Sequence, residues 1–490
     1  MSARGHGSEA RLRLFDDAGM SAELRKNLYL VIWAVTAGML GTVVTTGPVW
    51  SGFQRQVLGA NDFQLGLISA IPYAVSALQI FMSYIMEKRR NRRFLFLFFG
   101  ILGRSFWILI GLVPYIFPSF GVDLRIWLVI VFVGIIFFGN SFVNLGFGSL
   151  MGDLVPIRIR GSYFGVRQMV SLASGVIAGL LISSMIDRVG ITGYSIALVL
   201  AGISQLMDIT CFYFIKWPPM PESKDDHTSL LTMVREVFTN KNFVKLILFY
   251  SIWIFSANIA GPFWNVYMLE DLKMSFTQMS LYSQIISNIA TVLVISRWGR
   301  LIDRYGNKPI LQMATIFMAL SPLPWFFATP ASTYFILISN IFSGASWPVS
   351  DLCQQNLYLS HSPQKHRSMF IAVFLACINL FGVAFANMVG GFLMQTPFTA
   401  LAEQHYVLLG MEMNSSRYMF LATVLLRILV LIFFLPHINE EGAWTMHAAI
   451  KDMIRLSREG FDRRILQFRI KWLRKRWRRH YEEQKMNKEE

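Results

Sequence analysis

The amino-acid sequence predicts an all-α membrane protein with many spans, and two observations carry that prediction. Of its 490 residues, 54% are hydrophobic and only 15% are charged, whereas soluble domains carry about 25% charged residues. Apolar runs of roughly 20 residues recur along the chain, and each is long enough to cross a hydrocarbon core of ~30 Å. Because lipid offers no hydrogen-bond partners to the backbone, we expect these runs to be helices.

The net charge of +16 comes from 45 Lys and Arg against 29 Asp and Glu. In a soluble protein this balance would suggest nucleic acid as a partner. Here the basic residues gather in the loops and the tail, as the positive-inside rule describes for membrane proteins. We therefore expect no nucleic-acid partner.

The cysteines and the missing nucleotide motif limit the chemistry. Cys211, Cys353 and Cys377 fall in apolar runs without metal-ligand spacing, so we expect neither a metal nor a cofactor. The sequence has no Gly-x-x-x-x-Gly-Lys-Ser/Thr loop for ATP. We expect a protein that is not an enzyme and that draws its energy from an ion or substrate gradient.

The elements follow in a regular order. Residues 1–27 form a polar N-terminal segment, in which Ser21 is placed to cap a short helix on the membrane surface. A proline-rich connection at 216–243 separates two units, 28–215 and 244–437, and a tail covers 438–490. Twelve spans are expected at about 28–50, 63–86, 94–117, 125–150, 163–186, 191–215, 244–268, 277–297, 309–328, 333–358, 369–394 and 418–436.

The tail is expected to be a basic amphipathic helix from about 444 to 485. Phe461, Ile465, Phe468 and Trp472 would form one apolar stripe among many Arg and Lys residues. Such a helix is attracted to anionic lipid. The alternative is a solvated charged tail.

Loop charges predict the orientation. The loop between the second and third spans carries five basic residues between 88 and 93, while the loop at 329–332 carries none. Because basic loops face the cytoplasm, both termini are expected there. An even number of spans requires the same side for both ends.

A short polar loop at 299–309, the signature loop, has a degenerate copy after the second span. Glu87 matches Asp303 and Lys88 matches Arg304 when the two loops are aligned. A second repeated pair follows spans four and ten, where Pro156 matches Pro363. Two repeats at corresponding places indicate a duplicated six-helix unit.

The signature loop resembles that of the major facilitator superfamily, with a glycine, an acid–arginine pair, a second glycine and a basic residue. The resemblance covers about residues 28–436 and implies two six-helix bundles that rock about a midplane site. It points to bacterial members of unassigned substrate, hence to a monomer in the bacterial inner membrane. It also implies that the loop stabilises one state of the cycle through Gly299, Asp303, Arg304, Gly306 and Lys308, with Glu87 and Lys88 in the copy.

Asp351, in the tenth span, is the main candidate for a substrate or proton group, because charges within a bilayer are costly and rare. Trp347 shares its helix face, and Asn140 and Asn144 share the corresponding face of the fourth span. In the superfamily the first and fourth helices of each half line the cavity, so both faces are expected on the path. The alternative for Asp351 is a scaffold role with one hydrogen-bonding partner.

Further polar stripes are compatible with a cavity. Membrane bundles also use such residues for hydrogen bonds between helices, which is the alternative for each of them. The candidates are Thr42 and Thr46 in span one, Asn258 and Asn265 in span seven, and Gln284 and Asn288 in span eight.

Arg104 in span three and Asp208 in span six are expected to form a structural ion pair. In the superfamily these two spans lie away from the transport path. Arg427 in span twelve has no partner that the sequence reveals.

Three functions remain open at this stage. The first is secondary active transport of a small organic solute by alternating access, coupled to protons, with the aromatic content favouring an amphiphilic or apolar substrate. The second is facilitated diffusion by a uniporter. The third is a transporter-like sensor or scaffold at the membrane, to which the basic tail would belong.

Overall fold

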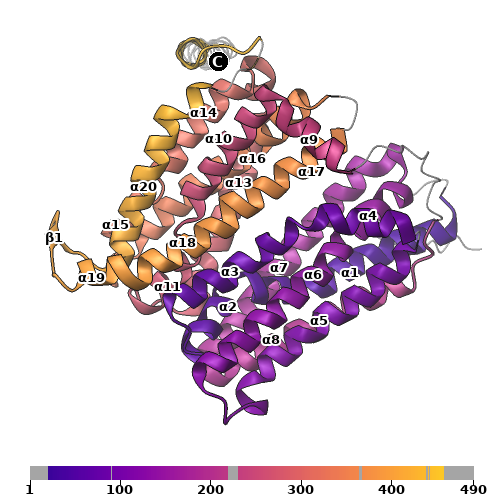
Figure 1. Cartoon of the computed structure of the whole chain (residues 1–490), viewed down its shortest axis with the longest axis horizontal. Helices are drawn as coiled ribbons and strands as arrows, with labels where there is room; N and C mark the ends of the chain where they lie inside the picture. The colour runs from indigo at the N-terminus through magenta and orange to yellow at the C-terminus, as the bar shows by residue number, and fades with distance from the viewer. Residues whose placement is uncertain are drawn as a thin grey trace, which may run out of the picture.

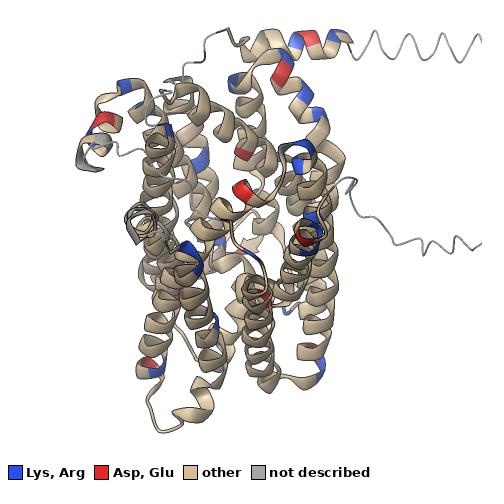
Figure 2. Cartoon of the chain, turned by 90° about the vertical axis from the view of Figure 1, so that its right-hand side faces the viewer, with Lys and Arg blue, Asp and Glu red and all other residues tan. Residues whose placement is uncertain are grey.

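The computed structural model describes residues 20–89, 91–218, 230–363, 367–437, 440 and 442–456. Within these residues the chain is helical except for connections and one small hairpin. Figure 2 shows that most of the helical ribbon carries neither an acid nor a base. Long uncharged helices are what a membrane-embedded chain requires.

The helices of the N-terminal half form the first group. A π-helical segment, Phe53–Val57, follows α2, and a 3₁₀ turn, Ile157–Ile159, precedes α7. The helices are α1 (Ala22–Thr46), α2 (Pro48–Gly52), α3 (Asp62–Ser76), α4 (Gln79–Arg89), α5 (Arg92–Ile116), α6 (Val122–Leu154), α7 (Arg160–Val189) and α8 (Ile191–Tyr213).

The C-terminal half forms the second group, after the connecting helix α9 (Leu230–Thr239). Its helices are α10 (Lys241–Asn258), α11 (Phe263–Glu270), α12 (Phe276–Ser280), α13 (Ile286–Tyr305), α14 (Asn307–Leu320), α15 (Leu323–Phe327), α16 (Tyr334–His361), α17 (Arg367–Cys377), α18 (Phe385–Leu393), α19 (Thr399–Ala402) and α20 (Ser415–Phe433). Its strands are β1 (Val407–Leu408) and β2 (Met411–Glu412), its π-helical segments Leu281–Ile285, Ile378–Ala384 and Met394–Phe398, and its 3₁₀ turn Leu435–His437.

Each group packs mainly within itself. In the first, α1 lies against α7 and α8, and α5 lies between α6 and α8; in the second, α16 packs on α13 and α14. The groups meet along α3 and α18, along α7 and α12, and along α2 and α11 (Figure 1). At Gly66 of α3 an added Cβ would lie 2.4 Å from the Asn387 carbonyl oxygen of α18, so only glycine allows this close approach.

Ten helical segments among the described residues are long and apolar enough to cross a membrane. The expected second and tenth spans are not among them. α3 and α4 are separate helices with a short turn between them, and α16 has 28 residues but a polar composition. Both are nevertheless helical where the sequence predicted helices.

The N-terminal end of the described chain differs from expectation. The Ser21 side chain accepts a hydrogen bond from the Leu24 amide and so caps α1 itself, which leaves no separate surface helix after it. At the other end, residues 446–456 are helical. The predicted apolar stripe from Phe461 to Trp472 lies outside the described residues.

Two helices of the second group break in the middle of their expected spans. α10 ends at Asn258, and α11 begins at Phe263 after Gly261-Pro262. α14 ends at Leu320, and Pro322 precedes α15. Proline lacks a backbone N–H and so interrupts the helical ladder. Non-helical backbone at membrane depth is tolerated where it is buried in protein or lines a wet cavity.

Candidate transport cavities

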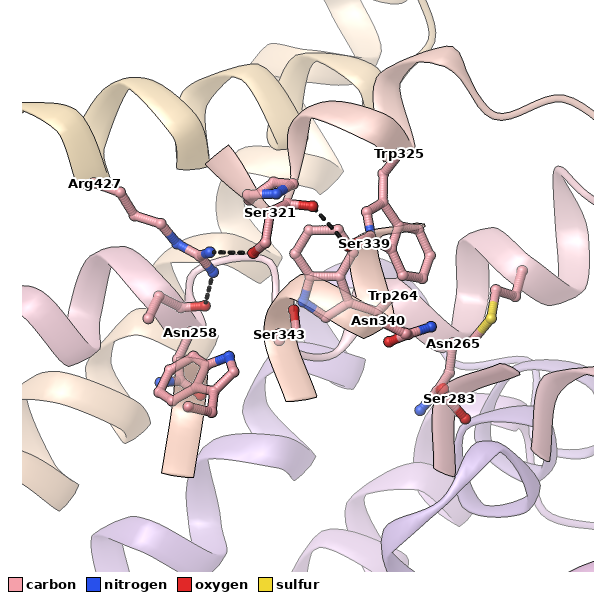
Figure 3. A pocket seen from close by; sticks show the side chains of 15 residues that line it. Asn258, Trp264, Asn265, Ser283, Ser321, Trp325, Ser339, Asn340, Ser343 and Arg427 are labelled. Carbon is pink, nitrogen blue, oxygen red and sulfur yellow. Dashed lines mark hydrogen bonds between the residues drawn. The ribbon is translucent and has the colours of Figure 1, made fainter. Parts of the chain in front are cut away.

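The structure has a cavity of about 350 Å³ within the second group, built around these two breaks (Figure 3). α11 contributes Trp264 and Asn265 to its lining, and α16 contributes Asn340, Ser343 and Trp347. Residues of the two breaks complete the lining. Three residues predicted from the sequence line the cavity: Asn258, Asn265 and Trp347. Six further lining residues were not predicted, and the two proline-containing breaks were the available signal for them: Trp264, Trp325, Ser283, Asn340, Ser343 and Arg427.

Arg427 of α20 bridges the two helix breaks. Its side chain is 3% exposed, and its guanidinium donates to the Met318 carbonyl at 2.6 Å, to Ser321 Oγ at 3.2 Å and to the Ala257 carbonyl at 3.0 Å. Ala257 and Met318 lie in the last turns of α10 and α14. Helix C-termini carry partial negative charge, so two of them compensate this buried cation.

The aromatic wall of the cavity is held from behind. Trp264 stacks on Phe420 with ring centroids 4.7 Å apart and an interplanar angle of 3°. Trp325 Nε1 donates to Ser339 Oγ at 2.7 Å, and that hydroxyl donates to the Ser321 carbonyl at 2.6 Å. These contacts fix both indoles before any ligand arrives.

A second cavity of about 340 Å³ lies in the first group. Four of the predicted residues line it: Thr42, Thr46, Asn140 and Asn144. Trp107 and Gln205 share the lining, and neither had been selected from the sequence.

The pair of Arg104 and Asp208 is formed, with Arg104 Nη2 2.7 Å from Asp208 Oδ2. Its location differs from expectation, because both residues line the cavity of the first group. Gly38 of α1 provides the physical reason. An added Cβ at Gly38 would lie 3.2 Å from Asp208 Cβ, so a bare backbone there lets α8 approach α1 and present its carboxylate to the cavity.

Asp351 lies on the cavity-facing stripe of α16. Asn340, Ser343 and Trp347 line the cavity, and Asp351 continues the same helix face one turn further toward the signature loop. The side chain is exposed, and the described residues offer its carboxylate no hydrogen bond or ion pair. Asp351 itself is not among the residues that line the cavity.

Two other candidates lie elsewhere. Gln284 and Asn288 line neither cavity. Gln284 lies in a π-helical segment at the junction of the two groups, beside Gly47 and Gly179 of the first. A position between the groups was not visible from helix spacing alone.

Several hydrogen bonds across the junction lie at the end of the molecule that carries Arg55, called here the Arg55 end, and two more run along α3, where Asn387 Nδ2 donates to the Ser69 carbonyl and Asn379 Nδ2 to Ser76 Oγ, both at 3.0 Å. Arg55 Nε lies 2.8 Å from Glu270 Oε1, and Ser183 Oγ lies 2.7 Å from Ser280 Oγ. The Asp187 carboxylate accepts from the Phe276 and Thr277 amides at 2.9 and 3.1 Å. The apolar core is also continuous across the groups here, so this end of the junction is closed.

The signature loop lies at the opposite end and is bound by the tail. Glu440 accepts from the Asn307 and Lys308 amides at 3.0 and 2.6 Å and so caps α14. Arg304 pairs with Asp452 at 2.9 Å. The contacts to Arg304 and to the N-terminus of α14 therefore come from acids of the tail, Asp452 and Glu440. The side chains of Glu87 and Lys88 lie outside the described residues.

The two glycines of the signature loop differ. Gly306 has a φ of +91°, a conformation that favours glycine, between α13 and α14. Gly299 has open space around its Cβ position, so no close helix approach depends on it.

A bundle of membrane-crossing helices with a polar cavity in each half is an arrangement typical of transport proteins. The sequence matches the profile of the Major Facilitator Superfamily over residues 28–387 and 253–449. The chain belongs to this family and is a multi-pass membrane protein of it. No curated protein matches the chain in sequence.

Solved structures share the fold at low sequence identity. A bacterial homologue of the human lysosomal transporter Spinster, in an inward-facing and unoccupied conformation, has a TM-score of 0.64 and 15% identity, covering 85% of this chain and 97% of its own. The nucleoside transporter NupG has a TM-score of 0.65 and 13% identity, covering 86% of this chain and 100% of its own. The D-xylose-proton symporter has a TM-score of 0.64 and 16% identity, covering 86% of this chain and 100% of its own.

Proposed function

We propose that this protein is a secondary active transporter, and not an enzyme, that moves a small organic solute by alternating access. One observation carries the proposal. Each half holds a cavity with polar lining residues, and several of the bonds that join the halves, including the Arg55–Glu270 pair, lie at the Arg55 end. Rocking of the halves about the cavities would break those bonds and close the opposite end. Membership of the superfamily supports a transport function.

In this proposal α3 with α4, and α16, complete a set of twelve spans in two halves, 28–215 and 244–437, joined by 216–243. The loop charges favour cytoplasmic termini in a bacterial inner membrane. The Arg55 end would then be extracytoplasmic and the state inward-facing. The tail would bind anionic lipid, and the protein would act as a monomer.

We assign proton coupling to Asp351. It is exposed, it lies on the cavity stripe, and a charge at this depth is costly unless it is used. Titration of its carboxylate would change the charge at the cavity mouth during each cycle. The D-xylose-proton symporter shows that the fold is used for such coupling.

Purified protein in liposomes tests this proposal with the solute that a thermal-shift screen against metabolites and drugs selects. Asp351→Asn is expected to abolish uptake driven by a pH gradient, by at least 10-fold, while solute counterflow persists. Glu403→Gln removes an exposed acid outside both cavities and is the matched control. If wild-type flux needs no pH gradient and Asp351→Asn changes nothing, the protein is a uniporter.

The contact between the tail and the signature loop is the observation that favours the alternative function as a sensor. Truncation after residue 456 keeps the docked helix and removes the rest of the tail. A transporter should retain its flux in liposomes after this truncation. A variant with normal flux argues against a sensor, whereas wild-type protein that carries no solute at all contradicts transport.

A further inference from the structure

We propose that the cavity of the second group binds an uncharged ring compound that carries hydroxyl groups. The inference rests on the proposed transport function and names its substrate class. It departs from the amphiphilic or apolar substrate that the aromatic content of the sequence favoured.

The cavity offers an ionic ligand no acid, and its cation is already hydrogen-bonded through both terminal nitrogens. Its lining residues include no acid, and its one cation is Arg427. Figure 3 shows the guanidinium directed at Ser321 and the neighbouring backbone. Its Nη1 and Nη2 atoms donate to two helix-terminal carbonyls and one hydroxyl, which stabilise the charge, while Nε has no partner among the described residues. An anionic ligand would have to compete with these bonds to reach the cation.

A cationic ligand meets a different obstacle. The nearest acid on the same helix face is Asp351, one turn beyond Trp347 and absent from the lining. An ammonium group inside the cavity would lose water without gaining a counter-ion from the lining, which is unfavourable. In the cavity of the first group, the charges of Arg104 and Asp208 neutralise each other in an ion pair at 2.7 Å.

Neutral polar groups are instead available. Asn340 Nδ2 is buried with no hydrogen-bond partner, although its side chain lines the cavity. Asn258 Nδ2 donates to the Ile254 carbonyl at 2.9 Å, which leaves its amide oxygen as an acceptor. A buried amide donor without a partner costs free energy, which a ligand hydroxyl would recover.

The two indoles of the cavity favour a ligand that contains a ring. Trp264 is fixed by its stack on Phe420, and Trp325 by its bond to Ser339. Rigid aromatic faces beside unpaired amides fit a compound with an apolar ring face and hydroxyl edges. A volume of about 350 Å³ accommodates one or two such rings.

Two series of matched compounds test the inference by tryptophan fluorescence and calorimetry on the purified protein. One is glucose, glucuronate and glucosamine; the other is uridine and uridine monophosphate. Within each series the ring is kept and the charge changes. The neutral member of at least one series is expected to bind at least 10-fold more tightly than its charged relatives.

Asn340→Leu is expected to weaken the binding of the neutral ligand at least 10-fold. Asn242→Leu, an exposed amide on the first turn of α10, is the control and should bind normally. Tighter binding of any charged relative, an unchanged affinity of Asn340→Leu, or no binding of glucose or uridine at their highest soluble concentrations would overturn the inference.

Failure of this inference differs from failure of the transport proposal. Binding of a neutral ligand without flux in liposomes would contradict transport and leave the site intact. Proton-driven flux of a charged solute, with no neutral ligand bound, would contradict the site and leave transport intact.

Discussion

At the scale of single residues, Asp271 has an unusual environment just after α11. Asn414 Nδ2 donates to its carboxylate at 2.6 Å. Burial raises the pKa of this carboxyl to about 6, the Glu270 charge adds to the rise, and Arg417 opposes it. Because the pKa in the unfolded chain is about 3.9, ionised Asp271 costs stability, and this cost grows as the pH rises from about 4 through 6.

Asp271→Asn is therefore expected to raise the thermal midpoint of the protein at about pH 7.5. The gain is on the order of 1 kcal/mol after allowance for partial solvent screening. At about pH 4 both forms are neutral, and the difference should vanish. Glu403→Gln, at the same end of the molecule, should shift neither value. A gain that is equal at both pH values would contradict the assigned cause.

At the scale of elements, the segment 440–456 binds the signature loop through several independent contacts. Glu440 caps α14, the Trp444 amide donates to the Tyr305 carbonyl at 3.0 Å, and Asp452 accepts from Tyr305 Oη and Arg304 at 2.9 Å. The Tyr305 hydrogen bond lowers the pKa of Asp452, with Arg455 and Arg304 acting in the same direction. This contribution is present above the ordinary carboxyl pKa and is lost only as the pH falls through the lowered value.

Glu440→Gln is expected to loosen the start of α14, because a charge-assisted helix cap is replaced by a neutral one. The expected loss is about 1 kcal/mol, or roughly five-fold faster hydrogen exchange at the Asn307 and Lys308 amides. Asp452→Asn should act on the same loop, with an equal effect from pH 5 to pH 8. Exchange rates at α14 that equal the wild type in both variants would show that the tail does not hold the loop.

At the scale of the whole molecule, the Arg55 end holds the two halves together. Arg55 pairs with Glu270 across the junction and with Asp62 within its own half at 3.1 Å. Removal of Arg55 would leave two acids facing each other without a cation. Partly exposed pairs contribute up to about 1 kcal/mol, which is roughly a five-fold change in a two-state equilibrium.

Arg55→Ala is thus expected to raise the population opened at the Arg55 end about five-fold. Spin labels at Tyr115 and Tyr406, exposed residues in different halves, would report the longer distance by double electron–electron resonance. The charge exchange Arg55→Glu with Glu270→Arg should recover part of the closed population. Unchanged distances in Arg55→Ala would show that the apolar core alone closes this end.

Several features of the site were predictable from the sequence because they depend on local spacing. Apolar length predicted the helices, and ten helical segments among the described residues are long and apolar enough to cross a membrane. The duplication expected from the repeated loops stays a prediction. The i, i+4 relations placed Asn140 with Asn144 and Trp347 with Asp351 on common faces. Seven polar candidates line one of the two cavities. The remaining three, Asp351, Gln284 and Asn288, depend on how the helices turn toward one another.

The sequence by itself determined that this chain crosses a membrane many times and belongs to the Major Facilitator Superfamily. Only the tertiary structure decided which polar faces look into a cavity. It also decided how the Arg427 charge is compensated, since its acceptors are mostly backbone carbonyls from helices more than 100 residues away. Hydrophobicity and repeated motifs can be read directly from the sequence. Contacts made by carbonyls that helix breaks leave free, and close approaches at glycines such as Gly38, form only when distant helices pack together.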